Sequence, residues 1–432
     1  MTSEAHALDV MDRALGAALA DDVSAILRGG SLWALRFADN AITQNSSAND
    51  TTLEIECALG ARHAAVSTNR LDGESIRTAA KRAEDAAQAS PPDPEYVPPP
   101  SQEETTKYSR PVSAWHDRTA ATQPDEIAEA VRRTSAAAGS RRLRLSGAFA
   151  GGERFIAVAN SRGLHAWHRS TEAEIHITAL GTDSSGWAQR CANDIDELKP
   201  DSVADEAMRI AETGGAPEEL PPGRYTVILR PAAVEEMVPY HMICDAKATD
   251  EGRTFLRGKL GQKVCGEKIT IRSDPADPRC PSDPFLTDGL AAPVLPWVDR
   301  GVLANMVTSQ YWARKQGRRT TGWPTNVIID GADRTLDQMI ASTDNGLLVT
   351  RFWYIRVVDP MRCLLTGMTR DGLFRIEGGR ITGRLKHLRF NESVPEALGR
   401  VEDIGRAERA TIGALVPTLK IRDFRFTSGT KF

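Results

Sequence analysis

The residues best suited to chemistry lie in one short segment, Glu235-Glu236-Met237-Val238-Pro239-Tyr240-His241. A metallopeptidase helix carries two histidines on one face, with a glutamate beside the first that activates a metal-bound water. Here His241 is present, and Glu236 stands five residues before it. Positions five apart lie about 500° around a helix, so these side chains share a face only where the helix is distorted. Pro239 would distort it, because proline removes a backbone hydrogen bond.

Three histidines in the first half of the chain form a second candidate cluster: His165, His168 and His176. A zinc ion needs ligands that converge at about 2 Å from one point. Residues three apart on a strand face opposite sides, so His165 and His168 would diverge. The pattern therefore favours structural histidines at an edge or turn over a metal site.

A small basic cluster surrounds two aromatic residues, Tyr311 and Trp312, and consists of Arg314, Lys315, Arg318 and Arg319. Aromatic side chains interleaved with cations can bind single-stranded nucleic acid. The commoner structure with this pattern is a solvated helix end, here near Gly317. The chain has 54 Lys and Arg against 58 Asp and Glu, a net charge of -4. It has no basic field to attract nucleic acid, so no direct nucleic-acid partner is expected.

The composition excludes several other classes of protein. Of 432 residues, 41% are hydrophobic and 26% are charged, as in globular proteins with large cores. No apolar run approaches the roughly 18 residues that span a bilayer, and the acidic Glu4, Asp9 and Asp12 do not suit a signal peptide. Six cysteines occur without any C-x-x-C pair. We therefore expect reduced thiols, a cytoplasmic location and no membrane association.

Three units would position these residues: 1–90, 108–213 and 223–432, with a proline-rich linker at 91–107. The first unit predicts, in order, a helix with Leu8, Met11, Leu15 and Leu19 inward, strands at 31–37 and 51–59 around a polar turn at 45–50, and a helix over 76–87. The second predicts helices at 125–137 and 202–212 around strands at 143–149, 154–160 and 173–180.

The third unit is the longest and the richest in strand signals. Its predicted elements include a strand at 225–229, a helix at 232–245, a strand at 347–358 and a hairpin with Gly378-Gly379 as its turn. The expected fold class is α+β, with N-terminal α/β units followed by a large strand-rich C-terminal domain.

Short segments spread along the chain resemble the TldD/PmbA family of gyrase modulators and metallopeptidases, especially its PmbA branch, which is also called TldE. The segments are 36–45, 252–261, 308–317 with Thr321-Gly322, 346–350, 369–372, 377–379 and 417–420. Each is short, but their order and spacing together make a chance match improbable. The resemblance implies the TldD/PmbA type of C-terminal domain and a cytoplasmic zinc peptidase system, often a heterodimer of a TldD-type and a PmbA-type subunit.

This chain departs from the family's catalytic pattern. Catalytic subunits of the family carry H-E-x-x-x-H on a helix and a cysteine ligand shortly before the final strands. Here Glu236 stands in place of the first ligand, Met237 in place of the general base, and His241 in place of the second ligand. Residues 401–412, where the cysteine would fall, contain none. A thioether cannot deprotonate water, and the loss of two of three ligands should leave zinc affinity too weak for a defined site.

The resemblance and the lost motif together imply a non-catalytic subunit without a cofactor of its own. Glu236 and His241 are then only weak residual metal candidates, and zinc is expected in a TldD-type partner that acts on peptides or unfolded small proteins. Two alternatives stay open: an autonomous metallopeptidase with a site rebuilt around Glu236 and His241, and a non-enzymatic module that binds a peptide or protein.

Overall fold

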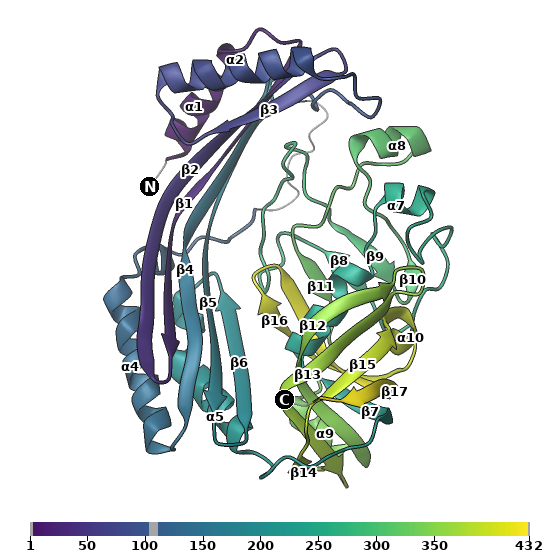
Figure 1. Cartoon of the computed structure of the whole chain (residues 1–432). Helices are drawn as coiled ribbons and strands as arrows, with labels where there is room; N and C mark the ends of the chain where they lie inside the picture. The colour runs from purple at the N-terminus through teal and green to yellow at the C-terminus, as the bar shows by residue number, and fades with distance from the viewer. Residues whose placement is uncertain (1–2, 103–110, 431–432) are drawn as a thin grey trace.

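Long antiparallel strands from the first half of the chain form one six-stranded sheet (Figure 1). The computed structural model describes residues 3–102 and 111–430. The sheet has the order β3-β2-β1-β4-β5-β6. Its strands are β1 (Asp22–Ala38), β2 (Ala41–Leu59), β3 (Arg62–Thr68), β4 (Arg144–Asn160), β5 (His165–Leu180) and β6 (Ser185–Ala192). Segments 1–90 and 108–213 both supply strands to this one sheet, in which β1 pairs with β4 from Ser24 to Phe37. Of the linker expected at 91–107, residues 103–107 lie outside the described residues.

The hairpin between β1 and β2 turns at Asp39-Asn40, whose φ angles of 49° and 63° are both positive. Two positive φ angles give a tight turn whose twist matches that of the flanking strands. The turn predicted at 45–50 was wrong, since those residues lie within β2. The polar side chains there are exposed, and the pairing of β2 with β1 places them in the sheet despite their turn-forming types.

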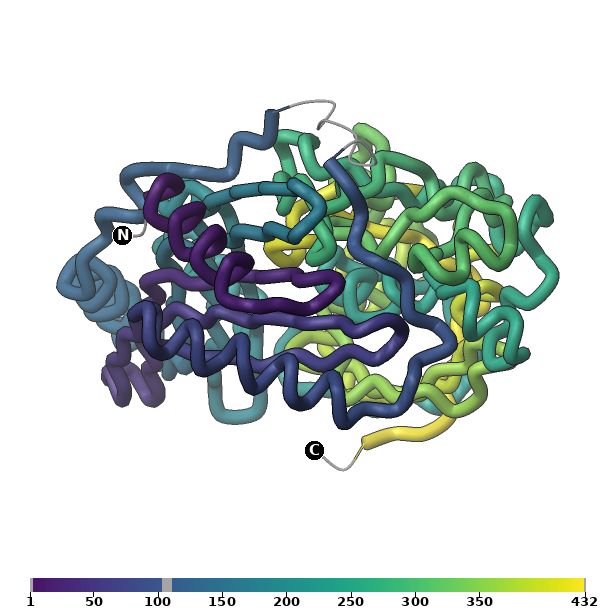
Figure 2. Tube along the Cα trace, turned by 90° about the horizontal axis from the view of Figure 1, so that it is seen from above, coloured from purple at the N-terminus to yellow at the C-terminus, as the bar shows by residue number. Residues whose placement is uncertain are grey.

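Helices cover one face of this sheet at both of its ends (Figure 1, Figure 2). The pair α1 (Glu4–Gly16) and α2 (Gly73–Ala89) packs on Val23, Ala25 and Leu27 of β1. The pair α4 (Pro124–Ser140) and α5 (Pro200–Glu212) packs on Leu35 and Phe37 of the same strand. All five positions are odd-numbered, and alternate residues of a strand share a face. The even-numbered residues therefore face away from the helices.

The second half of the chain forms a closed barrel. Strand β7 (Gly223–Leu229) pairs in parallel with β12 (Asn345–Asp359) and antiparallel with β17 (Ala414–Gly429). These contacts close the ring β17-β15-β13-β12-β7, in which β13 is Leu364–Glu377 and β15 is Leu388–Ser393. Phe352, Phe390 and Phe424 fill the barrel, with ring centroids 4.5 to 5.8 Å apart. Apolar rings buried in contact supply much of the stability of such a core.

Shorter elements extend the barrel into an 11-stranded sheet and cap its rims. The strands are β8 (Ile271–Ser273), β9 (Leu295–Asp299), β10 (Val302–Leu303), β11 (Val327–Ile329), β14 (Arg380–Arg384) and β16 (Val401–Thr411). The helices are α6 (Pro231–Met237), α7 (Ala246–Asp250), α8 (Gln310–Gln316), α9 (Leu336–Ala341) and α10 (Val394–Leu398), with 3-10 turns η1 (Ile195–Glu197) and η2 (Pro239–His241); α3 (Asp117–Ala120) precedes α4.

One buried arginine joins the two halves. Arg384 of β14 is 3% exposed and donates to the backbone carbonyls of Ser185 at 3.0 Å, Ala211 at 3.0 Å and Thr213 at 3.2 Å. It also donates to the carbonyl of Ile210. All four acceptors belong to β6, α5 and the residue after α5, so a single side chain satisfies the end of α5 and fixes it to the barrel.

The structure confirms the expected α+β class and the strand-rich C-terminal half. The helices at 76–87, 125–137 and 202–212, the strand at 347–358 and the Gly378-Gly379 turn are all present. Two predicted strands, 143–149 and 154–160, are one strand, β4. Leu19 was wrongly placed on the first helix, which ends at Gly16 and leaves Leu19 93% exposed. None of the described helices combines the length and apolar character that crossing a bilayer requires.

Candidate functional site

The segment that carries Glu236 and His241 follows directly from strand β7. Pro231 occupies the first turn of α6, where its missing N–H costs no hydrogen bond. The helix ends at Met237, and residues from Pro239 to His241 form the 3-10 turn η2. The helix predicted over 232–245 was therefore wrong in length. Pro239 was expected only to distort this helix, but the helix ends before it, which leaves Glu236 and His241 in two different elements.

Burial shifts the carboxyl and imidazole groups of this segment toward their neutral forms. It raises the pKa of Glu236 to about 7, opposed by Arg351 and reinforced by Glu235. It also raises the pKa of Glu235 and lowers that of His241. Within the described parts of the chain neither carboxylate has an ion-pair partner. Burial thus disfavours the charged forms of all three groups.

The arrangement does not fit a three-ligand zinc centre. Across 3–102 and 111–430, no three His, Cys, Asp or Glu side chains lie close enough together to hold a metal ion. Zinc sites in proteins use at least three protein ligands. The charged groups that act on Glu236 are Arg351 and Glu235, whereas burial alone shifts the pKa of His241.

The surroundings of α6 form part of the joint between the two sheets. Arg351 of β12 donates from Nε to Asp371 Oδ2 at 2.9 Å, and its guanidinium lies 4.6 Å from the ring centroid of Trp187 on β6. Arg230, which precedes α6, pairs with Glu206 of α5. A recess of about 340 Å³ opens beside the start of α6, between β6 and β16. The segment that carries Glu236 and His241 therefore lies where the barrel meets the first sheet.

The other predicted clusters are dispersed or solvated. His165 contacts Asp12 of α1 at 2.9 Å, whereas His168 lines a small recess with Asp283 on the other side of β5. Burial lowers the pKa of His176, farther along that strand. Helix α8 ends at Gln316 and is capped by Gly317 with φ of 62°, and the four cations of the basic cluster are exposed. All six cysteines are free thiols, and five are buried.

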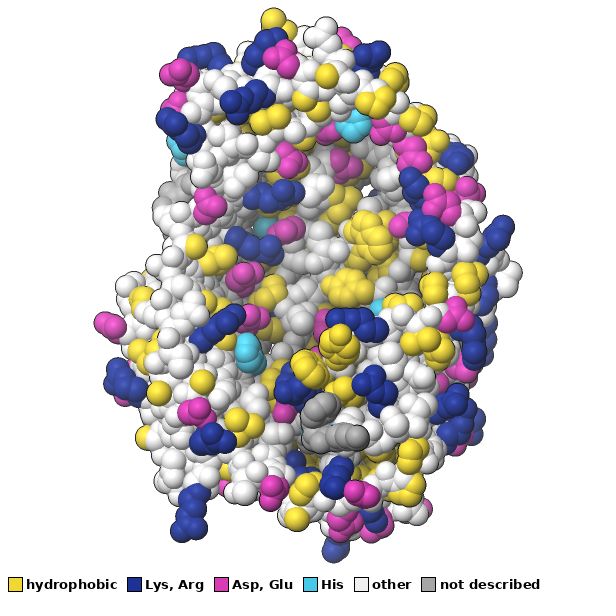
Figure 3. All heavy atoms as spheres, viewed as in Figure 1, with side chains coloured by type: hydrophobic (Ala, Val, Ile, Leu, Met, Phe, Trp, Pro, Cys, Tyr) yellow, Lys and Arg dark blue, Asp and Glu magenta, His cyan; other side chains and the backbone are white. Residues whose placement is uncertain are grey.

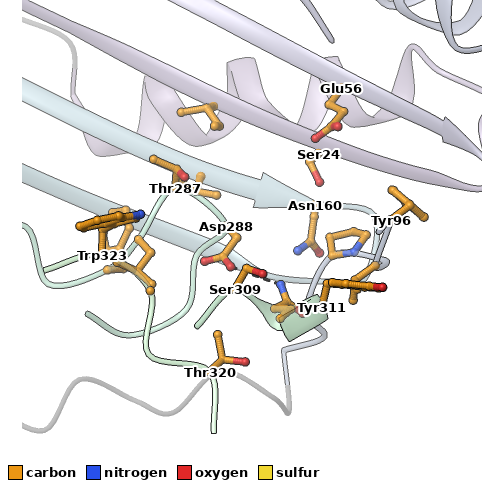
Figure 4. A pocket seen from close by; sticks show the side chains of 18 of the residues that line it. Ser24, Glu56, Tyr96, Asn160, Thr287, Asp288, Ser309, Tyr311, Thr320 and Trp323 are labelled. Carbon is orange, nitrogen blue, oxygen red and sulfur yellow. Dashed lines mark hydrogen bonds between the residues drawn. The ribbon is translucent and has the colours of Figure 1, made fainter. Parts of the chain in front are cut away.

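A cavity of about 950 Å³ was not predicted from the sequence. It lies between the helix-free face of the first sheet and the loops that surround α7 and α8, and Figure 3 shows the molecule hollowed there. Ser24 and Glu56 project from β1 and β2 toward Asp288 and Ser309, with Trp323 at one end (Figure 4). The sequence does contain one signal of this cavity wall. Along β1, Asp22, Ser24 and Ile26 alternate with apolar residues that are buried under the helices, and along β2, Glu54, Glu56 and Ala58 do the same.

Family comparisons agree with this architecture. Residues 117–214 match the model of the PmbA/TldA metallopeptidase central domain, and residues 222–428 match that of the PmbA/TldA metallopeptidase C-terminal domain. The chain belongs to the PmbA/TldD family. The second match spans the barrel and includes both α6, which carries Glu236, and η2, which carries His241.

Solved PmbA/TldD structures share the fold over the whole chain. TldE from Thermococcus kodakarensis superposes with a TM-score of 0.86 at 17% identity, covering 98% of this chain and 99% of that one. A proposed modulator of DNA gyrase from Thermotoga maritima gives 0.88 at 17% identity, covering 97% and 100%. Another from Bacteroides thetaiotaomicron gives 0.87 at 20% identity, covering 100% of each.

The curated relatives are more distant and only partly covered. A protein of Methanothermobacter thermautotrophicus named metalloprotease is 24% identical over 290 residues, 60% of this chain and 61% of that protein. A Methanocaldococcus jannaschii protein without an assigned function is 23% identical over 198 residues, covering 42% and 47%. The chain thus spans less than two thirds of the length of either relative.

Proposed function

We propose that this chain is a TldE-type subunit that lacks a metal centre of its own and works in the cytoplasm with a TldD-type catalytic partner on peptides or unfolded small proteins. The observation that carries the proposal is the separation of Glu236 and His241 into two elements, with no third ligand beside them in the described residues. The partner would supply zinc and the general base. Six free thiols agree with a reducing compartment.

In this role the chain would supply residues that line the substrate chamber rather than residues that bind the metal. Glu236 is close to half protonated near neutral pH, since its pKa is about 7. A neutral carboxyl attracts no cation, but it can still donate or accept a hydrogen bond from a peptide. The hollow between the first sheet and the barrel is bounded on both sides, which would restrict entry to extended or unfolded chains.

One observation favours the autonomous alternative. A carboxyl with a pKa near the working pH is suited to general-base catalysis, and Glu236 has such a value. If this chain were a peptidase alone, its isolated form would cleave peptides, and both a chelator and the substitution His241→Ala would abolish that activity.

Zinc content and partner binding test the proposal directly. The purified chain, analysed for zinc without added metal, should contain close to none, and a co-expressed TldD-type subunit should copurify with it. The pair should then hold about one zinc, bound by the partner. One zinc per isolated chain, or a partner that neither copurifies nor changes in peptidase activity, would overturn the proposal.

A further inference from the structure

The 950 Å³ cavity combines an excess of carboxylates with aromatic walls. Eight of its lining residues are Asp or Glu, whereas Lys247 is the only Lys or Arg among them. Strand alternation places Asp22, Glu54 and Glu56 there, on the face opposite the helices. The remaining acidic residues come from 93–95 and from the loops at 245, 283 and 288.

The acidic groups are only partly neutralised. Asp22 pairs with Arg162 at 2.7 Å, Glu95 with Lys247 at 3.1 Å, and Asp283 with Arg154 at 3.6 Å. Glu56 and Asp93 share a single His63, at 2.6 and 3.2 Å. Burial opposes protonation of that imidazole, but the two carboxylates outweigh it and raise the pKa of His63.

Three carboxylates are left without a cation among the residues that the structure describes. Asp245 caps α7 by accepting from the N–H of Ala248, and Asp288 accepts from Gln310 Nε2 at 3.2 Å (Figure 4). Glu54 has no ion-pair partner within the described chain. A concave site with unneutralised carboxylates attracts cations, because its walls exclude water and focus the field.

A second, independent feature is an unsatisfied donor. Trp312 lines the cavity and is 6% exposed, yet its indole N–H has no hydrogen-bond acceptor in the described structure. A buried donor without an acceptor costs about 1–3 kcal/mol. A ligand that brings a carbonyl oxygen would remove that cost. Trp323, 51% exposed, and Tyr311 add aromatic surface for an aliphatic stem or a cation.

We infer that this cavity binds a peptide segment that contains lysine or arginine. Such a segment brings an ammonium or guanidinium group for the carboxylates, an alkyl stem for the aromatic walls and a backbone carbonyl for the Trp312 N–H. A volume of about 950 Å³ accommodates a few residues of an extended chain. A polyamine has the same cationic chemistry but no acceptor. As a statement about which peptides the subunit pair processes, the inference rests on the proposed function; as a statement about binding, it concerns this chain alone.

Calorimetric titration of the isolated full-length chain tests the binding. The probes are a blocked hexapeptide that alternates lysine with alanine, the same peptide with acetylated lysines, and spermidine. The lysine peptide should bind about tenfold or more tightly than its acetylated form, and its affinity should fall as salt is raised. Spermidine should bind more weakly than the peptide.

Two variants locate the site. Glu54→Gln removes an unpaired charge and should weaken binding of the lysine peptide about 3- to 10-fold. Trp312→Phe keeps an aromatic side chain, although a smaller one, and removes the N–H, and it should weaken binding by a similar factor. The control is Glu267→Gln, an exposed position outside the cavity that should change nothing. No binding, equal binding of the acetylated peptide, or silent cavity variants would overturn the inference.

The remaining outcomes separate the two proposals. Spermidine binding as tightly as the peptide, with Trp312→Phe silent, would overturn the peptide in favour of a polyamine. Peptide binding by a chain that finds no catalytic partner would leave the inference intact and remove the accessory role. A zinc-bearing partner without peptide binding by this chain would support the accessory role and overturn the inference.

Discussion

The raised pKa of Glu236 comes from its buried surroundings more than from any specific contact. Burial is the main cause of its raised pKa, and Arg351 only partly offsets it. In the unfolded chain the same carboxyl ionises near its ordinary pKa of 4.5. The folded state therefore binds the extra proton between about pH 4.5 and pH 7, and the free energy of unfolding falls as the pH rises through that window.

Replacing this carboxyl by an amide should remove that part of the pH dependence. We expect Glu236→Gln to match the parent chain at pH 4.5 and to be more stable at pH 8 by about 1–3 kcal/mol, because the amide never has to ionise in a buried place. Urea denaturation at both pH values measures the difference. Glu267→Gln, at an exposed position, is the matched control. Equal stability of Glu236→Gln and the parent at pH 8 would contradict the argument.

At this scale, the residues that could be predicted were those that lie close together in the chain. Glu236, Pro239 and His241 were singled out, but Pro239 was expected to distort a continuing helix, and the helix instead ends at Met237. The sequence did not bring Glu54 together with Asp288 or Trp312, because the folded chain alone makes them neighbours in one cavity. Trp312 was noted for the cations beside it in sequence, yet it lines a cavity rich in carboxylates.

At the scale of elements, the hairpin at Asp39-Asn40 shows how one turn sets a register. The Asn40 side chain donates from Nδ2 to the Leu143 carbonyl at 2.9 Å, and its Oδ1 accepts from the Leu145 N–H at 2.7 Å. The turn of one hairpin is thereby fixed to the start of β4, more than 100 residues later. Asparagine tolerates the positive φ of 63° better than most residues.

Asn40→Ala should therefore be destabilising by about 2–4 kcal/mol, from two lost hydrogen bonds and the strain of a positive φ. Asn40→Gly loses the same bonds without the strain, so it should be less harmful than alanine by about 1 kcal/mol. Thermal unfolding of the three chains gives the order. A glycine variant less stable than the alanine variant would show that backbone strain is not a factor.

The same turn explains why the elements were only partly predictable. Residues 45–50, Asn-Ser-Ser-Ala-Asn-Asp, have the types that favour a turn, whereas Asp39-Asn40 is a shorter signal. Residues 45–50 pair with β1 along one edge of β2, and this pairing overrode their local preference for a turn. Helices with strong apolar periodicity, such as α2 and α5, were found because their signal is entirely local.

At the scale of the whole molecule, Arg384 links the sheet to the barrel. Replacing it with methionine keeps most of the volume but removes the hydrogen bonds that four backbone carbonyls accept from Arg384. We expect Arg384→Met to lower the free energy of unfolding by about 2–4 kcal/mol. Arg384→Lys keeps the charge but not the planar guanidinium group, so its free energy of unfolding should lie between those of the parent chain and Arg384→Met. Urea denaturation measures both, and an unchanged value for methionine would contradict this role.

The pairing of β1 with both β2 and β4 also has a consequence during synthesis on the ribosome. Strands β1 and β2 emerge together and can form their hairpin at once, but β4 begins at Arg144, about 85 residues after β2 ends at Leu59. At 5–20 residues per second, the free edge of β1 waits roughly 4–17 s for its second neighbour. An unpaired edge strand is a template for pairing with other chains. Nascent chains of this protein therefore pass through an interval in which chaperone binding at that edge competes with aggregation.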